Sequence, residues 1–283
     1  MRHAVTHLDV FGTARFSGNP LAVIHDADDL STDQMQMIAR WLNLSEVSFL
    51  VQPQDPTADY GVRIFTIAHE LPFAGHPTLG TCRAWLEAGG TPQDPARIVQ
   101  ECGAGLVEVR PHERGLAFRA PPLLRDEPVD ATDLGRLTTV LGVEPERVVD
   151  ARWIDNGPGW VGLLFASAAE VLDITPDLGA GPAMARFDVG LAGAAPEGAD
   201  HDLEVRALFS DGPGTIREDP ATGSLAAGLG GWLTATGRLP SSCVLRQGAA
   251  IGRDARLHVE RTSENTLWVG GTATPCLTGH LVS

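Results

Sequence analysis

The sequence predicts an α+β protein made of two similar halves, each a mostly antiparallel sheet rolled around one central helix. Three observations lead to this prediction: a short motif that occurs twice, an apolar helical segment after each copy, and many short strand-like segments elsewhere. The chain of 283 residues is long enough for two halves that each bury a core of their own. The pattern therefore indicates one unit used twice.

The repeated motif lies at Gly75–Thr81 and at Asp219–Ser224. With the two prolines aligned, each copy has a polar residue, the proline, two variable positions, a glycine and a small hydroxyl residue. The copies are 143 residues apart, about half the length of the chain. Proline is favoured at the first position of a helix, and a polar residue before it can cap that helix. We therefore expect central helices over about residues 77–89 and 220–236.

Both expected helices are too apolar for burial on one side only. Their apolar positions are Leu79, Ala84, Leu86 and Ala88 in the first helix and Leu225, Ala226, Leu229 and Leu233 in the second. A helix that is apolar on most sides is surrounded by the rest of its domain. Only the end of such a helix is then free to meet a ligand.

Short alternating segments predict strands in both halves. They cover residues 4–11, 20–25, 47–51, 60–67, 97–101, 105–110, 115–119, 147–154, 160–166, 203–209, 244–247, 256–261, 267–270 and about 277–282. Their close spacing indicates largely antiparallel pairing. A further helix is expected over 31–42, where Ser31 and Gln34 form a capping box, and another near 133–141.

The segment Arg119–Pro128 is the expected boundary between the halves. Prolines and charges in close succession favour an extended connector over a core element. We therefore expect an N-terminal half over 1–122 and a C-terminal half over 123–283, with the active-site cleft between them.

Composition narrows the class of partner. The net charge of −15 argues against nucleic acid or an anionic membrane surface as the main partner. No apolar run approaches the roughly 20 residues that span a bilayer, and no signal peptide is evident. The four cysteines show no metal-binding spacing and fit reduced thiols of a cytoplasmic protein, so no metal is expected. Dinucleotide-binding, P-loop and nucleophile-elbow motifs are absent.

The two motif copies suit an anionic ligand. A helix N-terminus with glycine and a small hydroxyl residue leaves backbone N–H groups accessible, and its dipole favours negative charge. Two such ends facing each other could hold a carboxylate and the charge that develops on a reacting carbon. The simpler alternative is that each copy is only a capped helix start.

Three side chains are candidates for proton transfer. Glu46 lies between a helix end and the apolar segment that follows, where a carboxylate can have a raised pKa and act as a general acid or base. The alternative is a solvated loop glutamate. His76 can titrate near neutral pH but can equally be structural. Asp219 can be an active-site acid or only a helix cap.

Several blocks of sequence resemble the phenazine-biosynthesis PhzF-like proteins. They are Asp9–Phe11, Phe16–Val23, Asn43–Glu46, Leu71–Gly80 and Glu218–Ser224. The blocks occur in order and span essentially the whole chain. The resemblance implies the diaminopimelate-epimerase-like fold, in which two α/β halves each roll a sheet around a central helix. That implication agrees with the internal repeat.

The resemblance also implies an activity. In the enzyme that gives this family its name, a glutamate matching Glu46 moves a proton between carbons of a dihydro-hydroxyanthranilate. Residues matching His76 and Asp219 assist it, and no cofactor takes part. The substrate-binding residues expected here are Ser45, Gly75, Gly223, Ser224 and Asn19. Family members are typically homodimers, so a homodimer acting on a small carboxylate is expected.

One departure and two alternatives stay open. The chain has Ile67–Glu70 where the family pattern leads us to expect Pro-Ala-Glu-Glu, and the histidine introduced at position 69 puts the phenazine precursor in doubt as substrate. An amino-acid epimerase or racemase on the same fold is one alternative. Its cysteine-dependent members need thiols at both helix starts, and Cys82 falls too late for that role. A non-catalytic small-molecule binder is the other.

Overall fold

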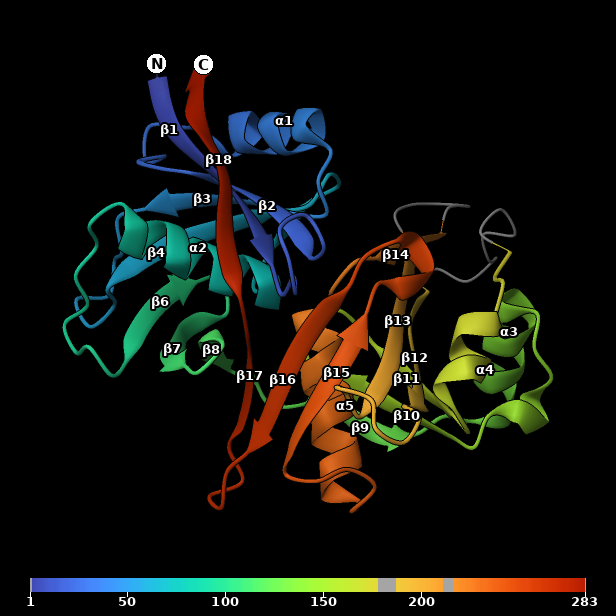
Figure 1. Cartoon of the computed structure of the whole chain (residues 1–283). Coiled ribbons are helices and arrows are strands. Elements are labelled where there is room, and N and C mark those ends of the chain that lie inside the picture. Colours follow the sequence, from blue (N-terminus) through green and yellow to red (C-terminus); the bar gives the residue numbers. More distant parts are fainter. Residues whose placement is uncertain (1, 178–186, 211–215, 283) are drawn as a thin grey trace. The chain divides into compact units, whose positions relative to one another are not determined.

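The structure is a computed structural model that describes residues 2–177, 187–210 and 216–282 (Figure 1). The chain divides into two compact units. The first consists of Met1–Arg119 together with Val269–Ser283, and the second of Ala120–Trp268. Each unit contains strands and a long buried helix, so the α+β class predicted from the sequence is confirmed.

The first unit is a sheet with one helix on its outer face and one at its centre. Its elements are β1 (Arg2–Val10), β2 (Asn19–Ile24), α1 (Thr32–Leu42), β3 (Val47–Val51), β4 (Tyr60–Phe65), β5 (Glu70–Leu71), α2 (Gly75–Glu87), β6 (Ile98–Cys102), β7 (Gly105–His112), β8 (Gly115–Arg119) and β18 (Ala273–Val282). Most neighbouring strands are antiparallel, while β2–β3 and β4–β6 are parallel. Apolar side chains of α1 pack on β2 and β3 around Phe49 and Met35.

The helix α2 is the central helix of the first unit. It contacts strands β1, β2, β3, β4, β8 and β18, and every residue from Gly75 to Cys82 is buried. Burial on all sides of its first two turns agrees with the apolar character of the sequence there. Gly80 lets the helix approach β2, since a Cβ at this position would lie 2.4 Å from a methyl group of Leu21.

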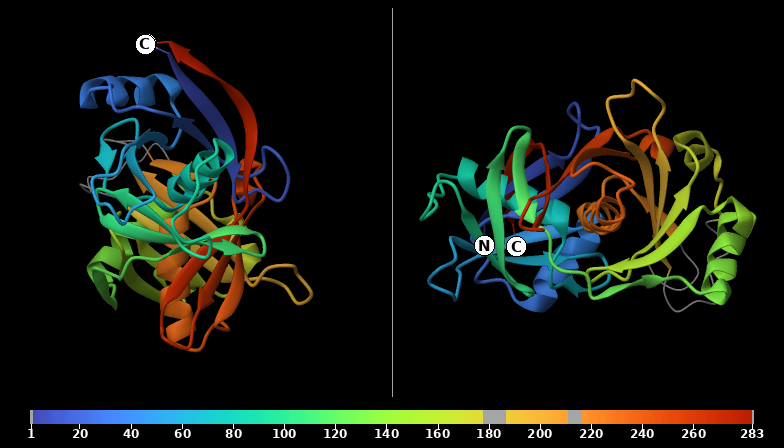
Figure 2. Two further views of the ribbon diagram at one scale, coloured as in Figure 1. Left: turned by 90° about the vertical axis from the view of Figure 1, so that its left-hand side faces the viewer. Right: turned by 90° about the horizontal axis from the view of Figure 1, so that it is seen from below.

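The second unit repeats this arrangement around α5. Its elements are β9 (Arg125–Pro128), α3 (Ala131–Leu141), η1 (Pro145–Arg147), β10 (Asp150–Asp155), β11 (Val161–Phe165), α4 (Ala168–Asp173), β12 (Asp188–Ala194), β13 (Leu203–Ser210), β14 (Ile216–Asp219), α5 (Gly223–Ala235), β15 (Ser242–Gln247), η2 (Ala249–Ile251) and β16 (Ala255–Arg261). The strand β17 (Leu267–Gly271) includes the boundary residue Trp268. Figure 2 (right) looks along α5 and shows strands of this unit on its sides.

The helix α5 is almost wholly buried, and α3 and α4 cover the other face of the sheet. Every residue of α5 from Gly223 to Gly230 is buried. The helix contacts β10, β11 and β16. Apolar residues of α3 and α4 pack on β11 and β12, where Phe165 and Leu191 are fully buried. Within α5 the exposed part is its C-terminal end at Ala235, in agreement with the central helix expected from the sequence.

The C-terminal strand corrects the expected division of the chain. A C-terminal half over 123–283 would include β18, but residues 269–283 belong to the first unit. The reason is pairing: β18 runs antiparallel to β1 from Arg2↔Val282 to Val10↔Ala273. The other boundary lies at Arg119/Ala120, close to the expected connector.

Contrary to what the sequence led us to expect, the two central helices do not begin at the prolines. The helix α2 begins at Gly75 after the N-cap Ala74, and α5 begins at Gly223 after the N-cap Thr222. His76 and Asp219 are therefore not caps. Both helices have 13 residues and begin at glycine, so the repeat aligns Gly75 with Gly223 rather than proline with proline. Pro77 still fits because N–H groups in the first turn of a helix have no partner within it.

Other predictions hold to within a few residues. The capping box of α1 is confirmed, with Ser31 accepting from the Gln34 backbone and the Gln34 side chain accepting from Ser31. The glycine-rich stretch after Ile174 contains the unpredicted strand β12, and its residues 178–186 lie outside the described part of the chain. Among the described residues, no helix is long and apolar enough to cross a membrane.

Candidate active site

Three predicted residues of the first unit meet at the start of α2. Asn19 is the first residue of β2, Glu46 directly precedes β3, and His76 is the second residue of α2. The strands β2 and β3 are parallel neighbours, with Ala22 opposite Val47, which brings Asn19 and Glu46 to the same end of the sheet. The His76 Nδ1 atom lies 3.6 Å from Glu46 Oε2 and 3.4 Å from Asn19 Nδ2.

His76 is a neutral imidazole in this setting. Only 3% of the residue is exposed, and burial lowers its pKa to about 3. Because the Asn19 amide nitrogen can only donate, Nδ1 accepts in this contact and the ring proton lies on Nε2. Within the described parts of the chain, that buried Nε2 has no hydrogen-bond partner. The ring therefore offers a donor at the start of α2.

Glu46 is not a solvated loop residue, because only 17% of its side chain is exposed. The left-handed Asn43 ends α1 at φ 54°, and Leu44 and Ser45 then lead to Glu46 at the edge of β3. Gly75 begins α2 and is buried, and the Ala74 cap makes no side-chain hydrogen bond to the first turn. The carboxylate, the neutral imidazole and the helix N-terminus thus form one set.

Asp219 is held at the end of β14 by a buried polar cluster. The Thr222 hydroxyl donates to Asp219 Oδ2 at 2.5 Å. The Gln247 side chain connects the same residues: its Nε2 donates to the Asp219 carbonyl and to the Thr222 hydroxyl, each at 2.9 Å, and its Oε1 accepts from the Thr222 backbone at 3.0 Å. Gln247 is 1% exposed. Its amide thereby fixes the segment between β14 and α5.

Ser224, the second residue of α5, is held by two side chains from the turn between β10 and β11. Trp160 Nε1 donates to the Ser224 hydroxyl at 2.9 Å, and Asn156 Nδ2 donates to the Ser224 carbonyl at 2.9 Å. The turn itself is shaped by Asp155, whose Oδ1 accepts from the backbone of Gly157 and Gly159 at 2.7 Å each.

Sequence reasoning missed Asn156, Trp160 and Gln247. The signal for the first two was a turn rich in glycine and proline with polar and aromatic residues at its ends, but such a turn is ordinarily only a loop. Gln247 gave no signal, since a single glutamine at a strand end has no motif. The structure places the predicted residues in two sets, one in each unit: Asn19, Ser45, Glu46, Gly75 and His76, and then Asp219, Gly223 and Ser224.

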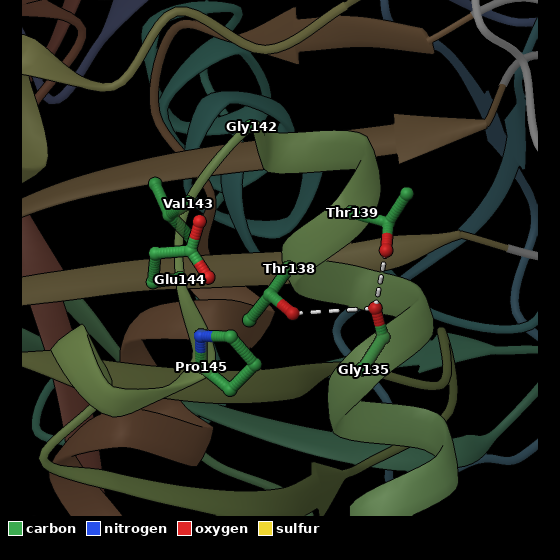
Figure 3. A pocket seen from close by; sticks show the side chains of 7 residues that line it. All are labelled: Gly135, Thr138, Thr139, Gly142, Val143, Glu144 and Pro145. Carbon is green, nitrogen blue, oxygen red and sulfur yellow. Dashed lines mark hydrogen bonds between the residues drawn. The ribbon is translucent and has the colours of Figure 1, made fainter.

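Two other features of the second unit contain no predicted site residue. A surface hollow is lined by Gly135, Thr138, Thr139, Gly142, Val143, Glu144 and Pro145 (Figure 3). Both of its threonine hydroxyls donate to the Gly135 carbonyl, so they are already used.

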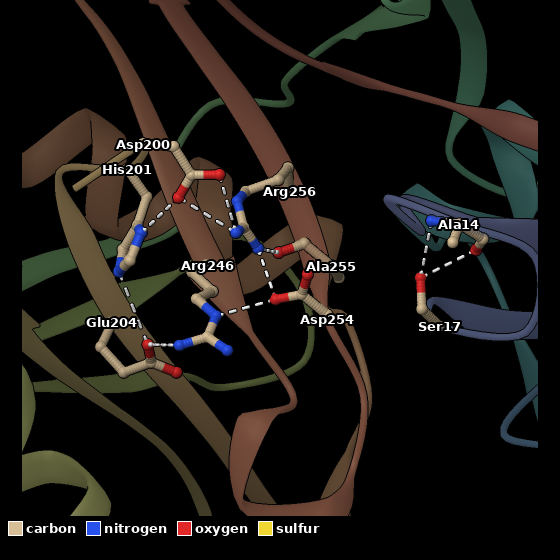
Figure 4. A network of polar contacts seen from close by, with 9 residues as sticks. All are labelled: Ala14, Ser17, Asp200, His201, Glu204, Arg246, Asp254, Ala255 and Arg256. Atoms are coloured by element: carbon tan, nitrogen blue, oxygen red, sulfur yellow. Dashed lines mark hydrogen bonds and ion pairs between the residues drawn. The ribbon is translucent and has the colours of Figure 1, made fainter.

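The other feature is a ring of ion pairs that joins β13, β15 and β16 (Figure 4). His201 lies in this ring with 9% of its side chain exposed. Burial raises the pKa of Glu204 there. Carboxylates that alternate with His201, Arg246 and Arg256 account for the ring as a structural link between strands. Among the described residues, no group of three His, Cys, Asp or Glu side chains could hold a metal ion.

Comparison with known proteins decides the family. A sequence model of phenazine biosynthesis-like proteins matches residues 8–279. The chain belongs to the phenazine biosynthesis-like family. It is 33% identical to antisense-enhancing sequence 1 of Schizosaccharomyces pombe, over 98% of both chains. It is 36% identical to a trans-2,3-dihydro-3-hydroxyanthranilate isomerase of Pseudomonas chlororaphis, over 89% of this chain and 88% of the other.

Solved structures agree with this family assignment. A PhzF-family protein of Bacillus anthracis superposes with a TM-score of 0.83 over 100% of both chains at 22% identity. A hydroxyproline epimerase of Agrobacterium vitis shares the fold, with a TM-score of 0.59 at 12% identity over 99% of this chain and 92% of the other. The diaminopimelate-epimerase-like fold predicted by the resemblance is therefore confirmed, and this member of the PhzF-like family is an isomerase.

Proposed function

We propose that this PhzF-like protein is a cofactor-independent isomerase that moves a proton between two carbons of a small cyclic carboxylate. The observation that carries the proposal is the contact between the Glu46 carboxylate and the buried, neutral His76 at the start of α2. A carboxylate can take a proton and return it without a cofactor. The name of the Pseudomonas chlororaphis relative adds the substrate class, a dihydro-hydroxyanthranilate.

In the proposed reaction, Glu46 removes a proton from a carbon next to an unsaturated or carboxyl-activated centre. The bonding electrons move into the conjugated system, a double bond shifts, and the proton is returned at another carbon, so that no atoms are gained or lost. His76 Nε2–H donates to an oxygen of the substrate on which negative charge develops. A neutral donor suits this role because it can stabilise charge without first losing its own proton.

The start of α5 takes part in the same reaction under this proposal. Asp219 assists proton transfer, and the backbone N–H groups of Gly223 and Ser224 bind the substrate carboxylate at a helix N-terminus. Support comes from the shared construction of the two helix starts. Each begins at glycine, and in each an asparagine contacts the second helical residue: Asn19 contacts His76, and Asn156 contacts Ser224.

An epimerase or racemase that uses thiols is the weaker candidate. Cys82 is the eighth residue of α2, and burial raises its pKa to about 12. A thiol with that pKa is protonated at neutral pH and cannot act as a base there. Gly75 and Gly223 occupy the helix starts where such thiols would be needed. A non-catalytic binder would give no reason for a carboxylate in contact with a buried imidazole donor.

Proton exchange in heavy water tests the proposal. The full chain is incubated with trans-2,3-dihydro-3-hydroxyanthranilate, and in parallel with other cyclic amino and hydroxy carboxylic acids. Carbon-bound hydrogen is followed by NMR. The proposal predicts deuterium at a ring carbon together with a shifted double bond. Binding of several acids with exchange of none would favour the binder, and exchange with inversion at one carbon would favour the epimerase.

We further propose that the protein is a cytoplasmic homodimer. All four cysteines are free thiols, which supports a reducing compartment. Light scattering at several concentrations measures the mass, and a value near the 29.9 kDa of one chain would contradict the dimer.

A further inference from the structure

One buried polar atom at the start of α5 is not used by the protein. Asn156 is 7% exposed, and its Oδ1 has no hydrogen-bond partner among the described residues. Leaving a buried amide oxygen unpaired is unfavourable, so such atoms are rare and usually meet a ligand or an ordered water. The cost at Asn156 needs an explanation.

The orientation of the Asn156 amide is fixed by its neighbour. Its Nδ2 lies 2.9 Å from the Ser224 carbonyl, which can only accept a hydrogen bond. Turning the amide over would place two acceptor oxygens against each other. Trp160 Nε1 donates to the Ser224 hydroxyl oxygen, which therefore already accepts one hydrogen bond. Oδ1 is therefore held as an acceptor beside the second residue of α5.

A second buried amide near the start of α5 differs from Asn156 in this respect. Gln247 is also a buried amide near the start of α5, but both of its ends are used. Its Oε1 accepts from Thr222, and its Nε2 donates to Asp219 and Thr222. Both ends of the Gln247 amide form hydrogen bonds within the protein, whereas Asn156 Oδ1 remains available as an acceptor.

We propose that Asn156 Oδ1 accepts a hydrogen bond from an amino or hydroxyl group of the substrate and thereby selects substrates that carry such a donor. This inference rests on the proposed function, because it places the substrate at the start of α5. The backbone N–H groups of a helix N-terminus can bind only acceptors such as a carboxylate. An acceptor held beside them complements a molecule with a carboxylate and a neighbouring donor, as a hydroxy or amino acid has.

The test measures binding without turnover, using three aromatic acids that have no saturated ring carbon from which a proton could be moved. The probes are 3-hydroxyanthranilate, anthranilate, which lacks the hydroxyl group, and 3-hydroxybenzoate, which lacks the amino group. Calorimetry with the full chain gives the loss of affinity for each deletion. The wild-type protein is expected to bind one of the two shorter probes, anthranilate or 3-hydroxybenzoate, about three- to tenfold more weakly than 3-hydroxyanthranilate. The ratio that matters is the affinity for 3-hydroxyanthranilate divided by the affinity for the weaker of the two shorter probes. In the Asn156→Ala variant this ratio is expected to be close to one.

Two further variants separate recognition from structure. Gln247→Leu removes the saturated amide, so it is expected to weaken all probes alike and to keep the wild-type ratio. Asn156→Gln keeps an amide with both a donor for the Ser224 carbonyl and an acceptor oxygen, and is expected to keep a ratio above one, which covers the case in which Asn156→Ala does not fold.

The inference would be overturned if Asn156→Ala weakened all three probes equally, if Asn156→Gln bound all three probes equally, or if the wild-type protein bound no probe or bound all three equally. Because these probes cannot isomerise, the affinity ratio does not depend on the outcome of the exchange experiment. Absence of exchange with the ratio intact would refute the isomerase and leave the recognition by Asn156 standing.

Discussion

His76 Nδ1 lies 3.6 Å from Glu46 Oε2, and the imidazole in this pair is neutral because burial lowers its pKa to about 3. The contact joins a carboxylate at the edge of β3 to the first turn of the central helix α2. It is consequently not a fixed ion pair at neutral pH. The neutral ring leaves the Glu46 carboxylate beside a polar group that carries no positive charge.

The pKa of His76 predicts how stability depends on pH. Between its ordinary pKa of 6.5 and about 3, the unfolded chain binds a proton that the folded chain does not. The free energy of unfolding therefore falls as pH is lowered through this window, by up to about 1.4 kcal/mol per pH unit. In His76→Gln this contribution is absent. Urea unfolding of both proteins at several pH values between 7 and 4 measures the difference.

The half-buried His7 and the buried His25 also have lowered pKa values, but they are present in both proteins and cancel in the comparison. The advantage of wild type over His76→Gln should shrink steadily on acidification. Parallel stability curves for the two proteins would mean that His76 titrates normally in the folded state.

Two glycines of α5 are predicted to respond oppositely to alanine. A Cβ at Gly228 would lie 2.7 Å from the Ile154 carbonyl, a backbone atom that cannot move aside. Gly228→Ala should therefore lower the free energy of unfolding by about 1–3 kcal/mol. At Gly231 the nearest atom, a methyl group of Leu267, is 3.7 Å away, so Gly231→Ala should raise it by up to about 1 kcal/mol. Thermal unfolding of both variants checks the pair, and equal effects would contradict the packing of α5 on β10.

The buried pair of Arg206 and Glu218 is predicted to hold β14 in place beside Asp219. Arg206 donates to both Glu218 oxygens at 3.1 and 2.8 Å, and its Nη1 donates to the carbonyls of Val171 and Ile174. Removing the arginine alone leaves a buried carboxylate without its cation. Arg206→Met should therefore cost about 3–5 kcal/mol of stability in urea unfolding.

A double variant separates the lost charge partner from lost packing. Replacing both members by apolar residues, as in Arg206→Met with Glu218→Leu, should recover much of the stability. The exposed Arg136 on α3 is the surface control, and Arg136→Met should change stability by less than about 0.5 kcal/mol. No recovery in the double variant would show that Arg206 acts through its contacts with Val171 and Ile174.

Periodicity and duplication predicted much of the fold. The apolar character of Leu79 and Leu229 was enough to predict buried central helices, because a helix without a polar face must be surrounded. The helix starts were misjudged because proline at the third position of α2 satisfies the same chemistry as proline at the first. The pairing of β18 with β1 was not predictable, since it joins the two ends of the chain and depends on no local pattern.

Some residues of the candidate site had a signal in the sequence, and others had none. Glu46, His76 and Asp219 were predicted from their local sequence and also lie in the blocks that resemble the family, and the structure adds the contact between the first two. Asn156 and Gln247 come from a turn and a strand end with ordinary sequences. Their importance rests on which atoms they meet at the start of α5, and that depends on tertiary structure alone.

The most direct test of the central claim is deuterium incorporation catalysed by wild type and by Glu46→Gln. Both proteins are incubated in heavy water with the acid that the wild type exchanges, and ring-carbon deuterium is followed by NMR. Glutamine has the same shape and cannot take a proton, so the variant should bind this acid with an affinity near that of wild type. The account predicts that exchange then falls by at least about a hundredfold. Exchange at the wild-type rate in Glu46→Gln would contradict it.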